Sequence, residues 1–425
     1  MHAAALVAAA LLSAGCAKTS RPDQPAVTES PIAPAPAVPV GSIEVAPTAT
    51  TAPAPRRSFW PIDTQSLRTT SADIWIGNLQ ARIDTLSASK HDPRRAGKLA
   101  AALYARYRVL GRIEDAEQAL AVLEAVPRAE LNGEEQLVLA RILSGFHRFG
   151  EAEALLKHLP DGALASERAA IGRDIDVALG RYRRLQDDFA VAEQPVNDFY
   201  ELAHRADLLV LQGKLAPAEQ QYRRAQSLYR DVDPMPLAWL HTQMGIALLR
   251  FGDIERARTF FAAAVDRLPG YALAEEHLAE CETLLGRFDR ARARYHRVIE
   301  QTGNPEFIAA LSGLERTTGH IEEADAWHAR ARARYASLLK RQPAAFGYHA
   351  VEFFIESGDA ERALGLAREN RKLRGDISSR ILLMRAARAA GADQEACWAW
   401  QEAAATGLNP PEWSEERGRS PCEED

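Results

Sequence analysis

Apolar residues recur at steps of three and four along most of the chain, the spacing that places them on one face of an α-helix. Residues 238–271 contain two such stripes, one on either side of Gly252. Glycine suits a turn that needs a positive φ, and Asp253 stands where a carboxylate can cap the next helix. The pattern therefore predicts two helices joined by a tight turn. The first stripe consists of Leu240, Met244, Ala247, Leu248 and Phe251, and the second of Ile254, Ala257, Phe261, Ala264, Val265 and Leu268.

The same two-helix unit recurs along the chain, and its turn marks each copy best. A small residue follows each turn at a constant distance, except at Leu185, and a proline closes most units. The spacing of the turns is close to the period of about 34 residues found in one class of helical repeat. The predicted turns are at Gly111, His147, Gly180, Gly213, Gly252, Gly286, Gly319, Gly358 and Gly391.

The order of small and large residues within the unit resembles the consensus of the tetratricopeptide repeat (TPR). The matching residues are Gly245, Leu248, Ala257, Phe261 and Pro269. A single helix pair is too small to bury both of its apolar stripes, so neighbouring pairs must stack on one another. The resemblance implies an all-α fold, a right-handed α-solenoid of about nine TPR-like helix pairs over residues 95–410.

Two intervals between turns are longer than the others, Gly213 to Gly252 and Gly319 to Gly358. The first contains a turn rich in Asp and Pro at 231–236, and in the second a long helix is expected to run to Leu339. Each irregularity should change the rotation between neighbouring pairs and bend the superhelix.

Residues 59–94 precede the array and contain one amphipathic helix, expected at about 72–88 with Ser71 and Asp73 as caps. We interpret it as a cap that covers the first pair, which solenoids need for solubility. The alternative is that it folds back into the groove of the array as an inhibitor. After the array, residues 411–425 are rich in acidic side chains and are expected to form a disordered tail.

The N-terminal residues resemble a bacterial lipoprotein signal. An apolar run at 3–12 leads into Leu-Ser-Ala-Gly-Cys, which is similar to a lipobox, although His2 rather than Lys or Arg precedes the run. The resemblance implies a signal peptide over 1–16, lipidation of Cys16, and anchoring in the outer membrane facing the periplasm, because Ala17 rather than Asp follows. The alternative is an ordinary apolar N-terminus with a chance cysteine.

Residues 17–58 contain nine prolines among Ala, Thr, Ser and Val. Such a segment cannot bury enough apolar surface to fold, so it is expected to be a disordered Pro-rich linker. A Pro-rich chain extends by roughly 3.1 Å per residue. This tether would allow the folded part to stand well away from a membrane.

Composition and motifs give little support to other classes of function. The net charge of −6 does not favour nucleic-acid binding. The signatures of metalloproteases, phosphate-binding loops and serine hydrolases do not occur, and His277 with Cys281 offers too few ligands for zinc. We therefore expect no catalytic site, cofactor or metal. Arginines cluster at 290–297 and 330–334, where a solvated outer face is the expected environment.

Three cysteines remain if Cys16 is lipidated. In an oxidising periplasm Cys397 and Cys422 can pair and attach the tail to the last unit, but spacing alone does not decide the pairing. Cys281 is expected to be a small buried side chain.

In TPR arrays the first helix of each pair lines a concave groove that receives a peptide or a helix. Register with the unit around Gly252 implies a partner-binding groove in which aromatic groups supply area and charged groups fix orientation. The regular Lys and Asn pattern of the TPR carboxylate clamp is not found. The predicted groove residues are Tyr200, His204, Asp207, Trp239, Gln243, Arg250, His277, Glu280 and Arg316.

Together these observations predict a membrane-tethered TPR scaffold that binds other proteins in the bacterial cell envelope, for the assembly of a pilus, polysaccharide-export or cell-wall machine. The alternative is a regulatory adaptor that modulates an envelope hydrolase. An enzyme built on a helical solenoid would need a polar cluster in a closed pocket, and no signature indicates one.

Overall fold

The regular structure in the described part of the chain is helical, with no strand. The computed structural model describes residues 69–88, 93–159, 162, 164–190 and 196–422. The expected signal peptide at 1–16 with Cys16, and the expected linker at 17–58, lie outside these residues.

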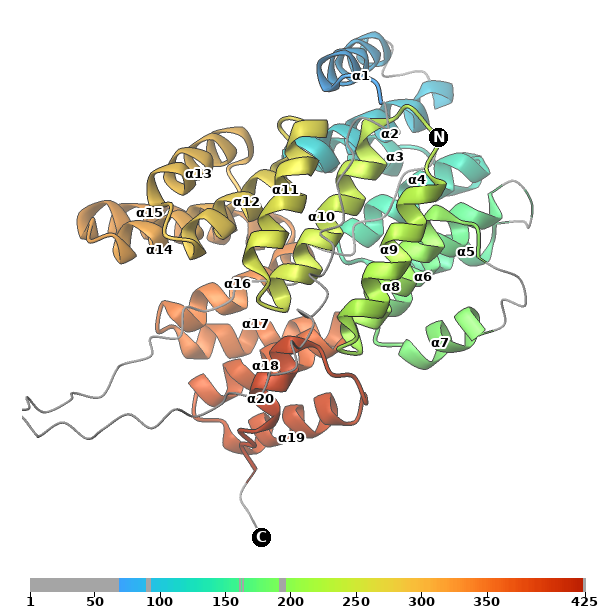
Figure 1. Cartoon of the computed structure of the whole chain (residues 1–425). Coiled ribbons are helices and arrows are strands. Elements are labelled where there is room, and N and C mark those ends of the chain that lie inside the picture. The colour runs from blue at the N-terminus through green and yellow to red at the C-terminus, as the bar shows by residue number, and fades with distance from the viewer. Residues whose placement is uncertain (1–68, 89–92, 160–161, 163, 191–195, 423–425) are drawn as a thin grey trace, which may run out of the picture. The chain divides into compact units, whose positions relative to one another are not determined.

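After the leading helix α1, the helices follow one another as nine pairs and end in the short helix α20 (Figure 1). In chain order they are α1 (Ala72–Ser87), α2 (Pro93–Leu110), α3 (Ile113–Glu124), η1 (Arg128–Glu130), α4 (Gly133–Gly145), α5 (Phe149–Lys157), α6 (Ala165–Ala178), α7 (Tyr182–Ala190), α8 (Phe199–Leu211), α9 (Leu215–Leu228), α10 (Pro234–Arg250), α11 (Ile254–Arg267), α12 (Ala272–Leu284), α13 (Phe288–Thr302), α14 (Pro305–Thr317), α15 (Ile321–Arg341), α16 (Pro343–Glu356), α17 (Ala360–Leu373), α18 (Ile377–Ala389), α19 (Asp393–Ala404) and α20 (Pro411–Arg417).

All nine predicted turns are confirmed. Each marker joins the two helices of a pair and has a φ between 58° and 86°, the left-handed region that glycine adopts without a steric penalty. His147 is the exception in residue type, since it is the one residue other than glycine with a positive φ in the described chain. The predicted right-handed α-solenoid of TPR-like pairs is therefore the observed fold.

Close packing within pairs follows the small and large positions read from the sequence. A Cβ on Gly245 would lie 2.6 Å from the ring of Phe261, so the two helices of that pair approach closely only because Gly245 has no side chain. The predicted long helix is α15, which continues to Arg341. Within α10 every residue but the last is buried, which makes this helix the most enclosed element of the array.

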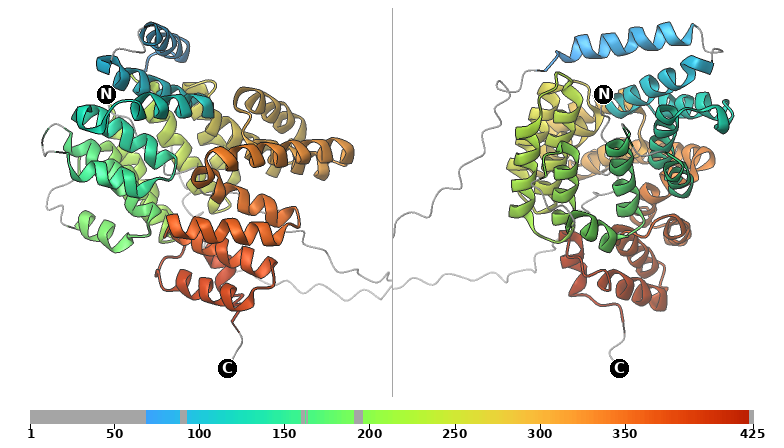
Figure 2. Two further views of the ribbon diagram at one scale, coloured as in Figure 1. Left: turned by 180° about the vertical axis from the view of Figure 1, so that it is seen from behind. Right: turned by 90° about the vertical axis from the view of Figure 1, so that its right-hand side faces the viewer.

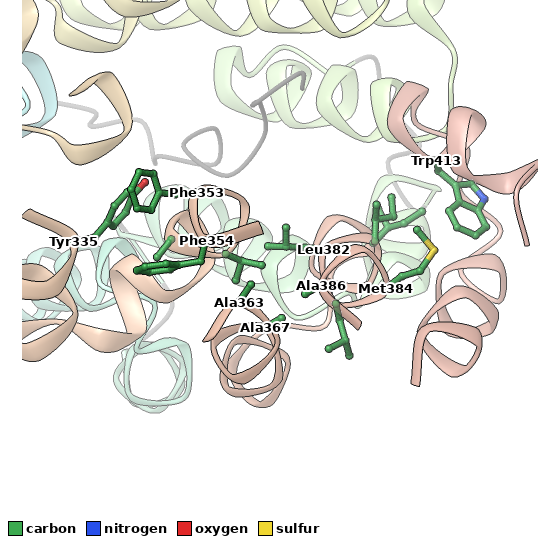
Figure 3. Close-up of a cluster of buried hydrophobic side chains, with 14 of the residues drawn as sticks. Tyr335, Phe353, Phe354, Ala363, Ala367, Leu382, Met384, Ala386 and Trp413 are labelled. Atoms are coloured by element: carbon green, nitrogen blue, oxygen red, sulfur yellow. The ribbon is translucent and has the colours of Figure 1, made fainter. Parts of the chain in front are cut away.

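Two large clusters of buried apolar side chains hold the array together. One includes residues of α2 to α6, and the other is built chiefly on α12 to α20. In the second cluster Tyr335 packs on Phe353 with ring centroids 5.0 Å apart, and Trp413 of α20 lies beside Met384 (Figure 3). Both clusters include residues from distant pairs, such as Leu338 in the first, so apolar packing joins the two halves of the chain.

The second half of the array contacts the turns of the first four pairs. Four hydrogen bonds mark these contacts: Gln301 Nε2 to the Leu110 carbonyl (2.9 Å), His147 Nδ1 to the Ala344 carbonyl (3.0 Å), the Gly375 amide to the Ala178 carbonyl (2.9 Å), and the Asn409 amide to the Leu211 carbonyl (3.0 Å). The first two join residues 191 and 197 positions apart. With a repeat of about 34 residues, the array thus returns upon itself after about six pairs. We call this set of contacts the closure.

His147 shows why one turn is not a glycine. Its ring stacks on Phe149 at 5.4 Å, its Nδ1 faces the Ala344 carbonyl, and its Nε2 lies 3.4 Å from the guanidinium of Arg374. These partners require a neutral ring that donates from Nδ1 and accepts at Nε2. Burial and the charge of Arg374 accordingly lower the pKa of His147 well below its usual value. The His147 side chain therefore contributes contacts to the closure that a glycine could not make.

Helix α1 packs against α2 at one end of the helical part (Figure 2). It begins at Ala72 as predicted, but the side chain of Ser71 makes no capping hydrogen bond. The backbone just before it is held by a bond from the Thr70 amide to the Val232 carbonyl. The predicted disordered tail is wrong for 411–422, because α20 forms there and Trp413 is buried. Cys397 and Cys422 form a disulfide that holds the segment after α20.

The arginine clusters are less solvated than expected, because several of these side chains pair with carboxylates of neighbouring helices. Arg292 binds Glu315 at 2.7 Å and Arg294 binds Glu282 at 3.0 Å. In the described residues no helix is both long enough and apolar enough to cross a membrane.

Candidate functional site

A cavity of about 180 Å³ lies inside the array, where the first helices of the early pairs face the closure. We call it the interior cavity. Its walls come from α2, α6, α8 and α10 on one side, and from the starts of α14, α16 and α18 on the other. Three of the predicted groove residues, Asp207, Gln243 and Arg250, line it.

One wall of the cavity is acidic. The ring of His204 places Nε2 at 2.8 Å from Asp174 Oδ1 and Nδ1 at 2.7 Å from the Tyr200 carbonyl. Both partners are acceptors, so this geometry suits a protonated imidazole. Burial alone would lower the pKa of His204, but the charge and hydrogen bond of Asp174 outweigh it and raise that pKa.

Asp207 is the second carboxylate of this wall. It accepts a hydrogen bond from the Tyr222 hydroxyl at 2.5 Å, and burial raises its pKa to about 6. One oxygen of Asp207 and one of Asp174 accept no hydrogen bond from the described residues. The Asp207 carboxylate is costly to keep ionised in these surroundings, which makes its protonation sensitive to pH.

The remaining charges around the cavity are paired with each other. Arg250 donates to Glu412 of α20 at 2.5 Å, and its side chain is only 4% exposed. On the opposite wall His349 lies 2.6 Å from Glu306. Both signs of charge are thus present and mutually compensated. Such a cavity suits ordered water or a small polar molecule better than an extended peptide.

The nine predicted groove residues therefore do not form one open groove. Trp239, His204, Gln243 and His277 are buried, with Trp239 only 1% exposed. Arg316 is the exception, since its exposed side chain binds Asp325 at 2.6 Å. The prediction is wrong because Trp239 packs against Phe199 and Tyr200 of α8, while residues of the later pairs face Asp207, Gln243 and Arg250 across the interior cavity. Tyr200 packs near Trp239 at 6.1 Å, and Glu280 lies beside His277.

Several lining residues were missed by the sequence reasoning. Asp174 lies one repeat before Asp207 in the same register, so the period could have identified it. Glu306, His349 and Arg374 come from pairs that reach the cavity only through the closure, and no local pattern predicts that contact.

A separate cluster on α12 offers ligands of the kind that hold a metal ion. One ligand atom from each of Glu276, His277 and Glu280 lies within 4.8 Å of the others. His277 is not paired with Cys281, which is a buried free thiol. The second nitrogen of His277, which metal sites normally hold with a hydrogen bond, has no partner in the described residues. Burial raises the pKa of Glu276 to about 8, so this cluster readily keeps a proton.

We expect the contribution of Asp207 to stability to decrease as pH rises from 4 to 8, whereas the lowered pKa values of His147 and His241 act in the opposite direction. The folded-state pKa of Asp207, about 6, exceeds the unfolded value of about 3.9, so the folded state binds the proton more tightly. This stabilisation is complete below pH 4 and is lost as pH rises through 6. At about 1.4 kcal/mol per pKa unit, it is on the order of 3 kcal/mol. Burial raises the pKa of Glu352 to about 7, which acts in the same direction.

Urea unfolding followed by circular dichroism at pH 5 and pH 8 measures this effect. Asp207→Asn should reduce the difference between the two pH values, whereas the exposed Asp187→Asn should not change it. If the difference in unfolding free energy between pH 5 and pH 8 is the same in wild type and in Asp207→Asn, Asp207 does not contribute to the pH dependence of stability.

Comparison with known proteins supports the repeat assignment. Residues 248–314, from the end of α10 through most of α14, match the family model of the tetratricopeptide repeat. No curated protein sequence is significantly similar to the chain. Among solved structures, a chain of the APC/C hetero-tetramer Cut9-Hcn1 aligns with 77% of this chain at 13% identity and a TM-score of 0.44, and this alignment spans 62% of that chain. Human IFIT1, solved as a dimer with PPP-AAAA, aligns with 78% of this chain and 88% of its own at 14% identity and a TM-score of 0.42.

Proposed function

We propose that the protein is a lipid-anchored scaffold that holds protein partners in the bacterial cell envelope. The observation that carries the proposal is the array of TPR-like pairs in the described residues, on a chain that also has the lipobox-like residues ending at Cys16. The tetratricopeptide repeat, whose family model matches residues 248–314, is a protein-interaction module. An array of this kind offers a large surface and needs no catalytic group.

The pairing of Cys397 with Cys422 supports an envelope location. Disulfides form and persist in oxidising compartments such as the bacterial periplasm, and they are rare in the cytosol. The Pro-rich segment at 17–58 would then separate the lipid from the array and allow it to reach partners at a distance from the membrane. The partner binds on outer surfaces of the array, because most of the predicted groove residues are buried.

Lipid labelling tests this function. The full-length protein is expressed in a Gram-negative host with a palmitate analogue, crosslinked, fractionated and affinity-purified. We expect labelled protein in the outer membrane with envelope proteins attached, and loss of both label and membrane location in Cys16→Ala. Cys281→Ser is the matched control and should stay labelled, because its thiol is buried in the array. Label that persists in Cys16→Ala, or wild type that is soluble and unlabelled, would refute the anchor.

A further inference from the structure

A second hollow, of about 380 Å³, opens where the start of α1 meets the loop between α9 and α10. Its aromatic lining consists of Trp75 from α1, Phe199 and Tyr200 from α8, and Tyr229 from the loop. We call it the aromatic pocket. It is separate from the interior cavity, which has a different set of lining residues.

The rings of the aromatic pocket support one another. Phe199 meets Tyr200 edge to face with centroids 4.9 Å apart, and it lies 5.3 Å from Tyr229. The Tyr229 hydroxyl donates to the Asp233 carbonyl at 2.7 Å, which fixes that ring at the end of the loop. The Thr70 amide, just before α1, donates to the Val232 carbonyl, which joins the start of α1, with Trp75, to the loop that contains Tyr229. The rings of Phe199, Tyr200 and Tyr229 thus form a packed aromatic surface.

Negative charge surrounds these rings. Asp198, Asp231 and Asp233 line the pocket, and Arg230 is the one basic residue among the described residues of its lining. None of the three carboxylates forms an ion pair within the described residues. Arg230 donates to the Tyr229 carbonyl at 2.7 Å, and the nearby Arg267 donates to Thr69 at 3.1 Å.

Each of these aspartates uses one oxygen for a backbone amide. Asp198 and Asp233 cap α8 and α10 at 2.7 and 2.9 Å, and Asp231 accepts from the Val232 amide at 2.6 Å. Burial raises the pKa of Asp233, and the charge of Asp231 adds to this shift while the charge of Arg108 opposes it. The pocket therefore has both the ring faces and the carboxylates that attract a cation.

We propose that the aromatic pocket binds a lysine or arginine side chain of a protein partner. The inference rests on the proposed scaffold function, and it identifies one place where a protein partner would contact the array. A cationic side chain places its aliphatic stem against the rings and its charged end near the three carboxylates. Charge complementarity favours this occupant over an acidic peptide, which the carboxylates would repel.

One competing occupant belongs to the chain itself. Arg56 and Arg57 come shortly before the first pocket residues in the sequence, and they have the same guanidinium group as an arginine of a partner. The experiment must therefore distinguish the two sources.

Fluorescence anisotropy of a labelled peptide tests the proposal with the full-length protein in detergent. The probe is a heptapeptide of alternating glycine and arginine, and the control peptide has citrulline, a neutral isostere, in place of arginine. We expect the arginine peptide to bind about tenfold more tightly than the citrulline peptide, and the difference to shrink as salt is added. Equal binding of the two peptides would overturn the proposal.

Two variants locate the binding. Asp231→Asn keeps an oxygen for the Val232 amide and removes only the charge, so it should weaken binding about threefold to tenfold with unchanged helical content. Trp75→Leu should weaken it similarly. The exposed Asp187→Asn, which lies outside the pocket, should bind as wild type does.

The remaining outcomes overturn the proposal. An equal loss in Asp231→Asn and Asp187→Asn would mean unspecific attraction to an acidic protein. A large gain of affinity on replacing both Arg56 and Arg57 by glutamine would show that the chain's own arginines occupy the pocket. Because lipid labelling does not depend on this pocket, failure here leaves the scaffold proposal standing, and a failed anchor does not affect the peptide titration.

Discussion

Gly375→Ala should lower the free energy of unfolding by about 3 kcal/mol or more, because it inserts a methyl group into the closure. A Cβ at this position would lie 2.3 Å from the Leu179 carbonyl oxygen and 2.8 Å from its carbon. Both are backbone atoms, which cannot rotate away as a side chain can. Moving the loop apart would also stretch the bond from the Gly375 amide to Ala178. Urea unfolding followed by circular dichroism measures the loss.

The matched control separates this clash from ordinary glycine effects. Gly252 has a φ of 77°, yet a Cβ there would meet nothing within 4 Å. Gly252→Ala should therefore cost only the strain of a left-handed alanine, about 1 kcal/mol. Gly375→Ala should in addition enlarge the particle in small-angle X-ray scattering as the closure opens. A wild-type unfolding midpoint for Gly375→Ala would mean that the loop after α17 does not rest on the turn at Gly180.

The helix pairs were predictable because their signals are local. Each turn lies between two apolar stripes, and the small position of a pair, such as Gly245 against Phe261, is within one repeat of its partner. These features need only the geometry of one helix pair. Even His147 was recognised by its spacing, although its role in the closure was not visible in the sequence.

The closure was not predictable from the sequence. It depends on the small rotations between neighbouring pairs, which add up over about six pairs before distant residues come into contact. No sequence pattern predicts the contact between Gly375 and Ala178. The groove prediction failed in part for the same reason: it assumed an open solenoid, in which Gln243 would face solvent, but Gln243 lines the interior cavity. The residues that complete the interior cavity, such as His349, come from the far side of the closure.

The prediction of a disordered tail failed for a different reason: it relied on acidic composition and could not take account of specific contacts. Its acidic residues indicated disorder, yet Glu412 binds Arg250, and Glu416 binds Arg385 at 2.8 Å and Arg388 at 3.1 Å. Trp413, 1% exposed, packs near Trp400 with centroids 5.6 Å apart. Charge counts say nothing about partners elsewhere in the chain, so a helix stabilised by such partners is missed.

Replacing Cys397 and Cys422 by serine should destabilise the end of the array by about 3 kcal/mol, the amount expected for opening a loop of this length. The two residues are 25 positions apart, and the loop between them contains α20. Because repeat arrays can unfold in parts, the loss should appear locally, as faster tryptic cleavage after Arg417 and Arg419. The rest of the array should keep its wild-type unfolding midpoint.

Dithiothreitol provides the control for this variant. It should speed cleavage of the wild type and of Cys281→Ser, whose disulfide is intact, and leave the double serine variant unchanged. If wild type is cleaved at the same rate with and without reductant, the ion pairs of Glu412 and Glu416 and the packing of Trp413 hold α20 without help. Slow cleavage of the double variant would lead to the same conclusion. If cleavage accelerates as expected, the disulfide holds the segment after α20 and thereby helps to keep Glu412 of α20 against Arg250.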